Sequence, residues 1–155
     1  MGKIDRDEYI LLFTIGEIKF GLRLSQVERV LPAVELSVLP GAPAVVDGVI
    51  NLAGDTLPIV NFRKRLKKRK KEIHPSDKII IVQTNELKLG FFVDEVVGLK
   101  ELNSDKFKVT DDVIPHTNIV VEGVTIIDNE IVLIHDINRF FSIQEKNKLL
   151  KVLRF

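Results

Sequence analysis

Short apolar segments with a period of two recur along this chain, and they constrain its fold more than any other feature. In the clearest one, alternate positions are apolar: Ile18, Phe20, Leu22 and Leu24. Successive side chains of a strand point to opposite faces, so this alternation predicts a half-buried strand. Residues 87–93 repeat the pattern. Many short strands separated by turns, with little helix, predict an all-β fold of the barrel or sandwich kind.

The predicted strands follow one another as hairpins. Their ranges are 9–15, 18–24, 45–52, 56–62, 78–84, 87–93, 96–102, 119–127 and 131–134. Turn sequences separate several of them, at 16–17, 53–55, 85–86 and 128–129. Pro58 lies inside one predicted strand and lacks an N–H donor, so we expect an edge strand or a bulge there.

Helix signals are few and short. Ser25 and Glu28 have the spacing of a capping box, which predicts a helix of about two turns ending at Pro32. Asp136 is placed to cap a second short helix that buries Ile137. Residues 142–155 are charged and leucine-bearing, and we expect a helical tail.

The chain also contains a faint internal repeat. Residues 48–62 align without gaps on residues 123–137, sharing an opening Gly-Val, a polar turn, an apolar strand and then Asn61 or Asp136 before an apolar residue. This repeat favours two similar subdomains over one long sandwich.

Composition excludes several classes of protein. The chain has no cysteine, which excludes disulfides, iron–sulfur clusters and thiolate zinc sites. Its 23 basic and 22 acidic residues give a net charge of +1, so any charged partner must be recognised by a local patch. We find no signal peptide and no apolar run of the roughly 18 residues that span a membrane. We therefore expect a cytoplasmic protein without direct membrane insertion.

Signals of catalysis are weak, and we predict neither an enzyme nor a metal or cofactor site. The three histidines, His74, His116 and His135, are scattered and do not match a metal-binding spacing. No glycine-rich phosphate loop or nucleophile elbow occurs. We interpret His135 followed by Asp136 as a strand end beside a helix cap.

Residues 63–71 form a basic run with eight cations in nine positions. Such a run on a β-barrel could bind a nucleic-acid backbone. Single-strand binders usually add exposed aromatic side chains for base stacking, and this chain has one Tyr and no Trp. We therefore favour a solvated connection between two halves and keep a nucleic-acid-binding barrel as the alternative.

Five segments, taken in order, resemble the CheW family of chemotaxis coupling proteins. They are Phe20-Gly21 with the segment 26–30, then Gly48–Gly54, then Leu57–Phe62, then Leu89–Val96, and finally Ile131–Phe141, which resembles the closing strand and short helix of the family. The similarity covers about residues 9–141. It implies one domain made of two packed five-stranded β-barrels, approximately 15–70 and 76–141, with short helices.

The resemblance also implies a function and its partners. Family members are adaptors that couple the tip of a methyl-accepting chemoreceptor to the regulatory domain of the histidine kinase CheA, at receptor arrays. Carried over residue by residue, the kinase-binding residues are Leu24, Arg29, Val30, Asp47, Gly48 and Thr56. The receptor-binding residues are Val27, Ala53, Ile79, Ile80 and Val93.

Three positions depart from the family pattern. Ala53 stands where an Arg is usual, Arg29 where an acid is usual, and Asn61 where an Asp is usual. Ala supplies none of the five donors of a guanidinium, and Arg29 reverses the local charge. These departures predict a specialised pair of partners.

Overall fold

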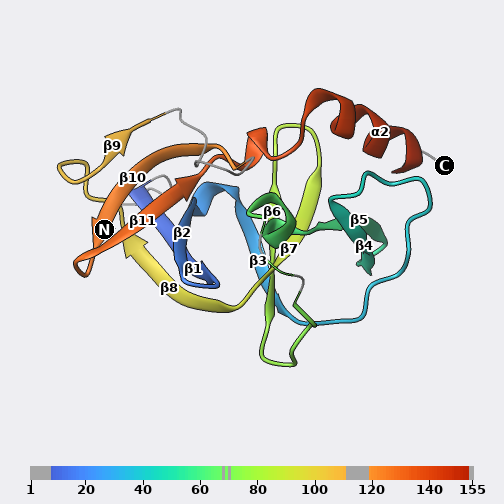
Figure 1. Ribbon diagram of the computed structural model, residues 1–155, viewed down its shortest axis with the longest axis horizontal. Helices are drawn as coiled ribbons and strands as arrows, with labels where there is room; N and C mark the ends of the chain where they lie inside the picture. The colour runs from blue at the N-terminus through green and yellow to red at the C-terminus, as the bar shows by residue number, and fades with distance from the viewer. Residues whose placement is uncertain (1–7, 68, 70, 111–118, 154–155) are drawn as a thin grey trace.

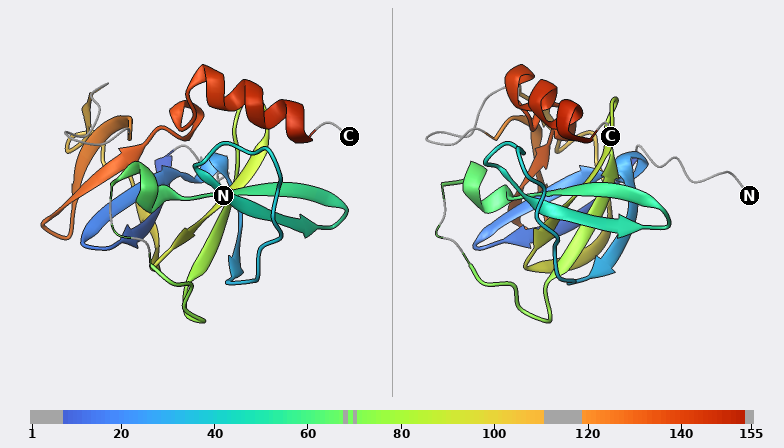
Figure 2. Two further views of the ribbon diagram at one scale, coloured as in Figure 1. Left: turned by 45° about the vertical axis from the view of Figure 1, so that its right-hand side comes forward. Right: turned by 90° about the vertical axis from the view of Figure 1, so that its right-hand side faces the viewer.

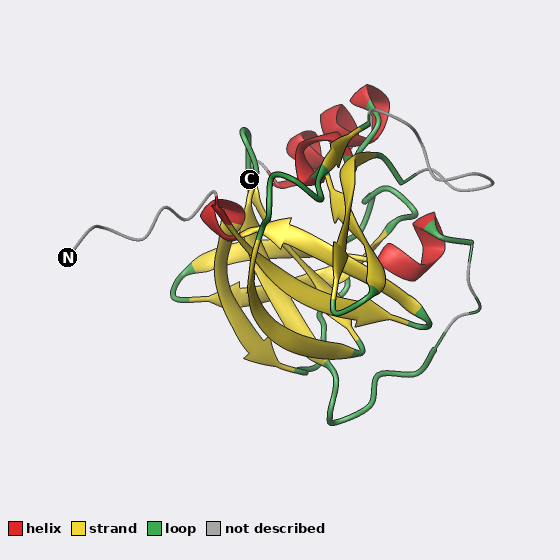
Figure 3. Cartoon of the chain, turned by 90° about the vertical axis from the view of Figure 1, so that its left-hand side faces the viewer, coloured by secondary structure: helices red, strands yellow, loops and turns green. Residues whose placement is uncertain are grey.

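Two β-sheets, in which most neighbouring strands are antiparallel, make up most of the molecule. The computed structural model describes residues 8–67, 69, 71–110 and 119–153. Within these ranges strands dominate and the few helices lie at the periphery (Figure 3). This confirms the predicted all-β class with short helices and two β subdomains.

The first sheet has six strands in the order β8-β1-β2-β11-β10-β9. We call it sheet A. Its strands are β1 (Tyr9–Ile15), β2 (Ile18–Arg23), β8 (Glu95–Glu101), β9 (Lys108–Val109), β10 (Val121–Ile127) and β11 (Glu130–His135). The parallel pairing of β2 with β11 places Phe20 beside Leu133.

The second sheet has five strands in the order β3-β6-β7-β5-β4, and we call it sheet B. Its strands are β3 (Val27–Pro32), β4 (Val46–Leu52), β5 (Asp55–Val60), β6 (Lys78–Gln83) and β7 (Lys88–Val93). Here β5 and β7 pair in parallel, with Ile59 beside Gly90. The two sheets lie at opposite ends of the long axis, with β10 and β11 at one end and β4 and β5 at the other (Figure 1).

The sheets do not follow the predicted division of the chain into 15–70 and 76–141. The hairpin β1–β2 belongs to sheet A with β8–β11, and the hairpin β6–β7 belongs to sheet B with β3–β5. Each hairpin is followed by a strand of the other sheet, since β3 pairs with β6 and β8 pairs with β1. Hydrophobic patterning predicts single strands but carries no information on which sheet a strand joins.

Three hydrophobic clusters hold this arrangement. The largest includes Phe13, Phe20, Ile80 and Phe91 and lies between the two sheets. A second, around Ile59, Ile79 and Ile81, belongs to sheet B alone, and a third, around Ile10, Leu12 and Ile134, belongs to sheet A alone. Alternate residues of β1 and β6 therefore serve different clusters, which explains why these strands are apolar on both faces.

The predicted helix at residues 25–31 is wrong. A single 3₁₀ turn, η2 (Leu24–Gln26), is followed directly by strand β3. β-Branched Val27 and Val30 suit a strand, and pairing with β6 supplies the backbone hydrogen bonds that a two-turn helix would have made within itself. Tertiary pairing thus overrides the capping-box signal.

The internal repeat is present in the structure. Both hairpins, β4–β5 and β10–β11, have a register shift at the same place, between Val46 and Gly48 and between Val121 and Gly123. Their turns have positive φ at two successive residues, 53–54 and 128–129. Each hairpin ends in a side-chain cap, Asn61 for α1 (Phe62–Arg65) and Asp136 for η3 (Ile137–Arg139).

Pro58 lies in β5, which is not an edge strand, because β5 has β4 on one side and β7 on the other. The pairing with β7 covers only Ile59 and Val60, so Pro58 lies on the part of β5 that pairs with β4 alone. At Pro58 itself β5 therefore has an unpaired side, so the missing N–H is tolerated because the position is locally an edge.

The C-terminal segment forms helix α2 (Ile143–Leu153), which runs outside both sheets (Figure 2). Ser142 and Glu145 form a reciprocal capping box at its start. Leu149 is fully buried, and the Glu145 carboxylate pairs with Arg65 of α1. The helix is thus packed against the body of the domain. No helix in the described ranges combines the length and apolar content needed to cross a membrane.

Candidate partner-binding surfaces

Strand β3 carries the first group of predicted site residues at an edge of sheet B. Arg29 is exposed and Val30 is 39% exposed, so both are available to a partner. Leu24, in η2, is half-buried and packs against the large cluster. Val27, predicted to contact a receptor, is only 8% exposed and is part of the core.

The hairpin β4–β5 carries the second group. Asp47, Ala53 and Thr56 are all exposed, and Ala53 lies in the turn with a φ of 52°. Asp47 accepts a hydrogen bond from the Asn61 side chain at 3.3 Å. These three side chains define the surface that this hairpin offers.

Gly48 is buried and has an internal structural role. Ser37 pairs with Val49 in an isolated bridge, which brings the segment after β3 across β4. A Cβ atom on Gly48 would lie 2.5 Å from the Ser37 carbonyl oxygen and 3.0 Å from Leu36 Cβ. Glycine is therefore required by this close approach of the chain to itself.

The remaining receptor-binding predictions fall on core residues. Ile79 and Ile80 are fully buried and Val93 is 1% exposed, so they offer no surface to a helix of a partner. Ile79 belongs to the sheet B cluster, whereas Ile80 and Val93 belong to the cluster between the sheets. Because these strands are buried on both faces, their apolar sequence alone could not show which residues reach the surface.

The basic run is partly engaged within the domain, while Lys67 and Arg69 are exposed as expected of a solvated connection. Arg63, Lys64 and Arg65 form most of α1, and each has a partner: Arg63 pairs with Asp94, Lys64 donates to the Ala44 carbonyl and Arg65 pairs with Glu145. Two residues of the run, 68 and 70, lie outside the described residues. Cations engaged in this way are less available for phosphate groups, which weakens the nucleic-acid alternative.

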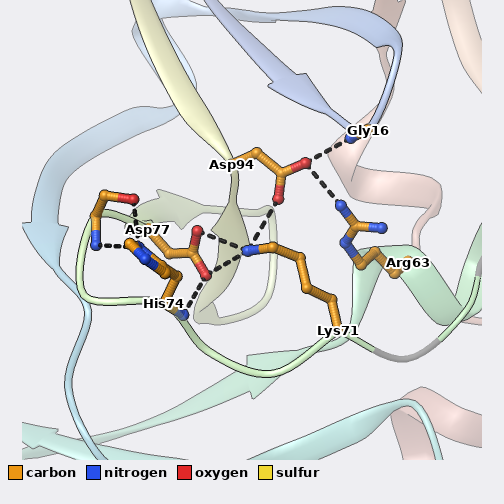
Figure 4. A network of polar contacts seen from close by, with 7 residues as sticks. Gly16, Arg63, Lys71, His74, Asp77 and Asp94 are labelled. Atoms are coloured by element: carbon orange, nitrogen blue, oxygen red, sulfur yellow. Dashed lines mark hydrogen bonds and ion pairs between the residues drawn. The ribbon is translucent and has the colours of Figure 1, made fainter.

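Asp94 is the centre of a polar network that links both sheets (Figure 4). It stands between β7 and β8, where the chain passes from sheet B to sheet A. Its carboxylate accepts from the Gly16 backbone N–H at 2.6 Å and from Arg63 at 2.7 Å, and Lys71 lies 3.5 Å away. The network therefore joins the β1–β2 turn, α1 and the crossover.

Asp77 is buried beside this network. Lys71 donates to both of its carboxylate oxygens at 2.8 Å, and the backbone N–H of His74 donates at 2.8 Å. Burial alone would raise the pKa of Asp77, but the hydrogen bonds and the charge of Lys71 outweigh it and hold the pKa below its ordinary value. The sequence does not predict the role of Asp77 in this network, because nothing near it in the sequence distinguishes a buried Asp from one in a turn.

His135 is fully buried at the end of β11, and neither ring nitrogen has a hydrogen-bond partner among the residues that the structure describes. Its ring lies 4.7 Å from that of Phe62 and 6.1 Å from that of Phe140, centre to centre. Burial lowers the pKa of His135 to about 3, so the ring is neutral at pH 7. No group of metal-ligating side chains occurs in the described part of the chain.

The fold is a small all-β domain of two sheets that offers an exposed edge strand and an exposed hairpin at its surface. The chain belongs to the family of CheW-like domains, because the model of that family matches residues 9–145. This family assignment confirms the resemblance that the ordered segments of the sequence indicated.

Individual relatives agree with this assignment over nearly the whole chain. The chemotaxis protein CheW of Treponema pallidum is 25% identical over 150 residues, covering 94% of this chain and 88% of that protein. CheW of Bacillus subtilis is 25% identical over 137 residues, with 88% of each chain covered. The crystal structure of the scaffolding protein TtCheW from Thermoanaerobacter tengcongensis superposes with a TM-score of 0.80 at 25% identity, covering 90% of this chain and 95% of that one.

Proposed function

We propose that this chain is the coupling adaptor of a bacterial chemosensory array, holding a chemoreceptor and the histidine kinase CheA together without catalytic chemistry of its own. The observation that carries the proposal is the match to the CheW-like family over residues 9–145, supported by the fold of a CheW scaffolding protein. On this proposal the adaptor works in the cytoplasm and is recruited to arrays at the inner membrane.

The kinase-facing surface that we propose consists of the exposed predicted residues only. Arg29 and Val30 contribute from β3, and Asp47 and Thr56 contribute from the β4–β5 hairpin. Gly48 acts indirectly, by letting the loop before β4 pack closely. For the receptor-facing surface we retain Ala53 as a contact residue. The other four predicted residues are buried and support this surface by packing beneath it: Val27, Ile79, Ile80 and Val93.

The internal repeat supplies a matched experiment. Thr56 and Ile131 occupy equivalent exposed positions of the two hairpins, paired with Asn51 and Ile126 respectively. We would measure binding to the regulatory domain of CheA from the same genome by calorimetry, for the wild type, Thr56→Arg and Ile131→Arg.

The proposal predicts that the wild type binds and that Thr56→Arg weakens binding by at least about tenfold, while Ile131→Arg leaves it within twofold. Failure of the folded wild type to bind would contradict the proposed function. Equal losses in both variants would contradict the placement of the surface on the β4–β5 hairpin.

A further inference from the structure

Arg29 differs from most arginines of the described chain in having an unengaged guanidinium group. Four others make ion pairs within the domain: Arg23 with Glu122, Arg63 with Asp94, Arg65 with Glu145, and Arg139 with Asp136. Within the described ranges, the Arg29 side chain is exposed and makes no hydrogen bond or ion pair; Arg69 of the basic run shares this property.

The local backbone presents Arg29 at a bulge. Val27 pairs with Val82 and Arg29 pairs with Ile81, so Glu28 is an extra residue in β3. Bulges commonly redirect a side chain and are frequent at sheet edges and functional sites. The acid adjacent to it in the sequence, Glu28, is already engaged by Lys88 at 3.2 Å, which leaves the charge of Arg29 without compensation from this neighbour.

The surroundings suit a protein interface. β3 is an outer strand of sheet B and pairs with β6 alone among the described strands. Next to Arg29, Val30 keeps 39% of its surface exposed. Arginine is enriched among the residues that dominate binding energy at protein interfaces.

We propose that Arg29 is the selectivity residue of the kinase-facing surface, with its guanidinium pairing to a carboxylate on the regulatory domain of the kinase. The inference rests on the proposed function and adds to it the chemistry of the matching partner. A guanidinium presents a rigid fork of donors that fits a carboxylate in two parallel hydrogen bonds and repels a basic group. A kinase with Lys or Arg at the facing position would therefore be rejected.

Arg69→Glu supplies the control for Arg29→Glu, because both variants reverse the charge of an exposed arginine that has no partner among the described residues. Binding to the regulatory domain of CheA from the same genome would be measured by calorimetry at low and moderate salt. We expect Arg29→Glu to weaken binding by at least about tenfold and Arg69→Glu to change it less than twofold. Replacing the facing carboxylate of the kinase domain by Lys should restore binding to Arg29→Glu alone.

The outcomes separate the two proposals. If the folded wild type does not bind, the proposed function fails and this inference fails with it. If the wild type binds and Arg29→Glu binds equally well, or if Arg69→Glu loses as much, the function stands and the role of Arg29 is overturned. Circular dichroism and thermal unfolding would establish that both variants are folded.

Discussion

Lowering the pH from 7 to 5 should destabilise this protein through His135. In the unfolded chain the imidazole titrates near its ordinary pKa of 6.5, whereas in the native state burial lowers the pKa of His135 to about 3. Below pH 6.5 the unfolded state therefore binds a proton that the native state does not, and stability falls as the pH falls. This contribution is fully present above pH 6.5 and decreases toward pH 3.

The magnitude follows from linkage. Protonation of this one residue stabilises the unfolded state by about 2 kcal/mol at pH 5, compared with a few tenths of a kcal/mol at pH 7. Such a loss is a large part of the 5–15 kcal/mol that is typical of domains. Asp77 and Glu145 have lowered pKa values, so their contributions are lost chiefly below pH 5 and do not overlap this interval.

Urea unfolding at pH 7 and pH 5 tests this prediction, with His135→Leu as the variant and His74→Gln as the control. His74 is exposed and contacts Ser76, so its replacement retains the buried imidazole. We expect the wild type and His74→Gln to lose about 2 kcal/mol more than His135→Leu between the two pH values. An identical pH dependence of the free energy of unfolding in the wild type and in His135→Leu would contradict this role of the buried imidazole.

Three further predictions concern stability. Gly48→Ala should lower the free energy of unfolding by about 1–3 kcal/mol in urea titrations, because the added Cβ would lie 2.5 Å from a backbone carbonyl oxygen; an unchanged midpoint would contradict this role. Asp94→Asn should cost about 1–2 kcal/mol by weakening its bond to Arg63, whereas Glu95→Gln, at an exposed position, should change stability by less than about 0.5 kcal/mol. Leu149→Ala should cost about 2–4 kcal/mol in thermal or urea unfolding, since the side chain is fully buried beneath α2; a loss below about 1 kcal/mol would mean that α2 is not packed as described.

Much of the fold follows from local patterns in the sequence. The hairpin around Gly16 and the turn at 128–129 are where the alternation and the turn residues predict them. The capping roles of Asn61 and Asp136 follow the repeat, although the sequence pattern predicts a helix only after Asp136. Such features depend on neighbours within a few residues, which a pattern can resolve.

What the sequence could not predict depends on contacts between distant segments. The strand at Val27–Pro32 was predicted as a helix because its pairing with β6 lies some fifty residues away. The resemblance carries Ile79 and Ile80 over to a partner-binding surface, and nothing local in the sequence corrects this, because a strand buried on both faces looks like one that lines a groove. The ion pairs of Arg63 and Arg65 likewise join residues far apart in the chain.

Coupling itself can be measured directly in a reconstituted system that contains CheA, receptor-bearing membranes and this chain. The measurement is the rate of kinase autophosphorylation with and without receptor ligand, in the presence and the absence of the chain. We expect the receptor ligand to change the rate of kinase autophosphorylation only when the chain is added, and we expect Thr56→Arg to weaken this effect. Control of equal size without the chain, or no control with it despite a folded protein, would contradict the assignment as a coupling adaptor.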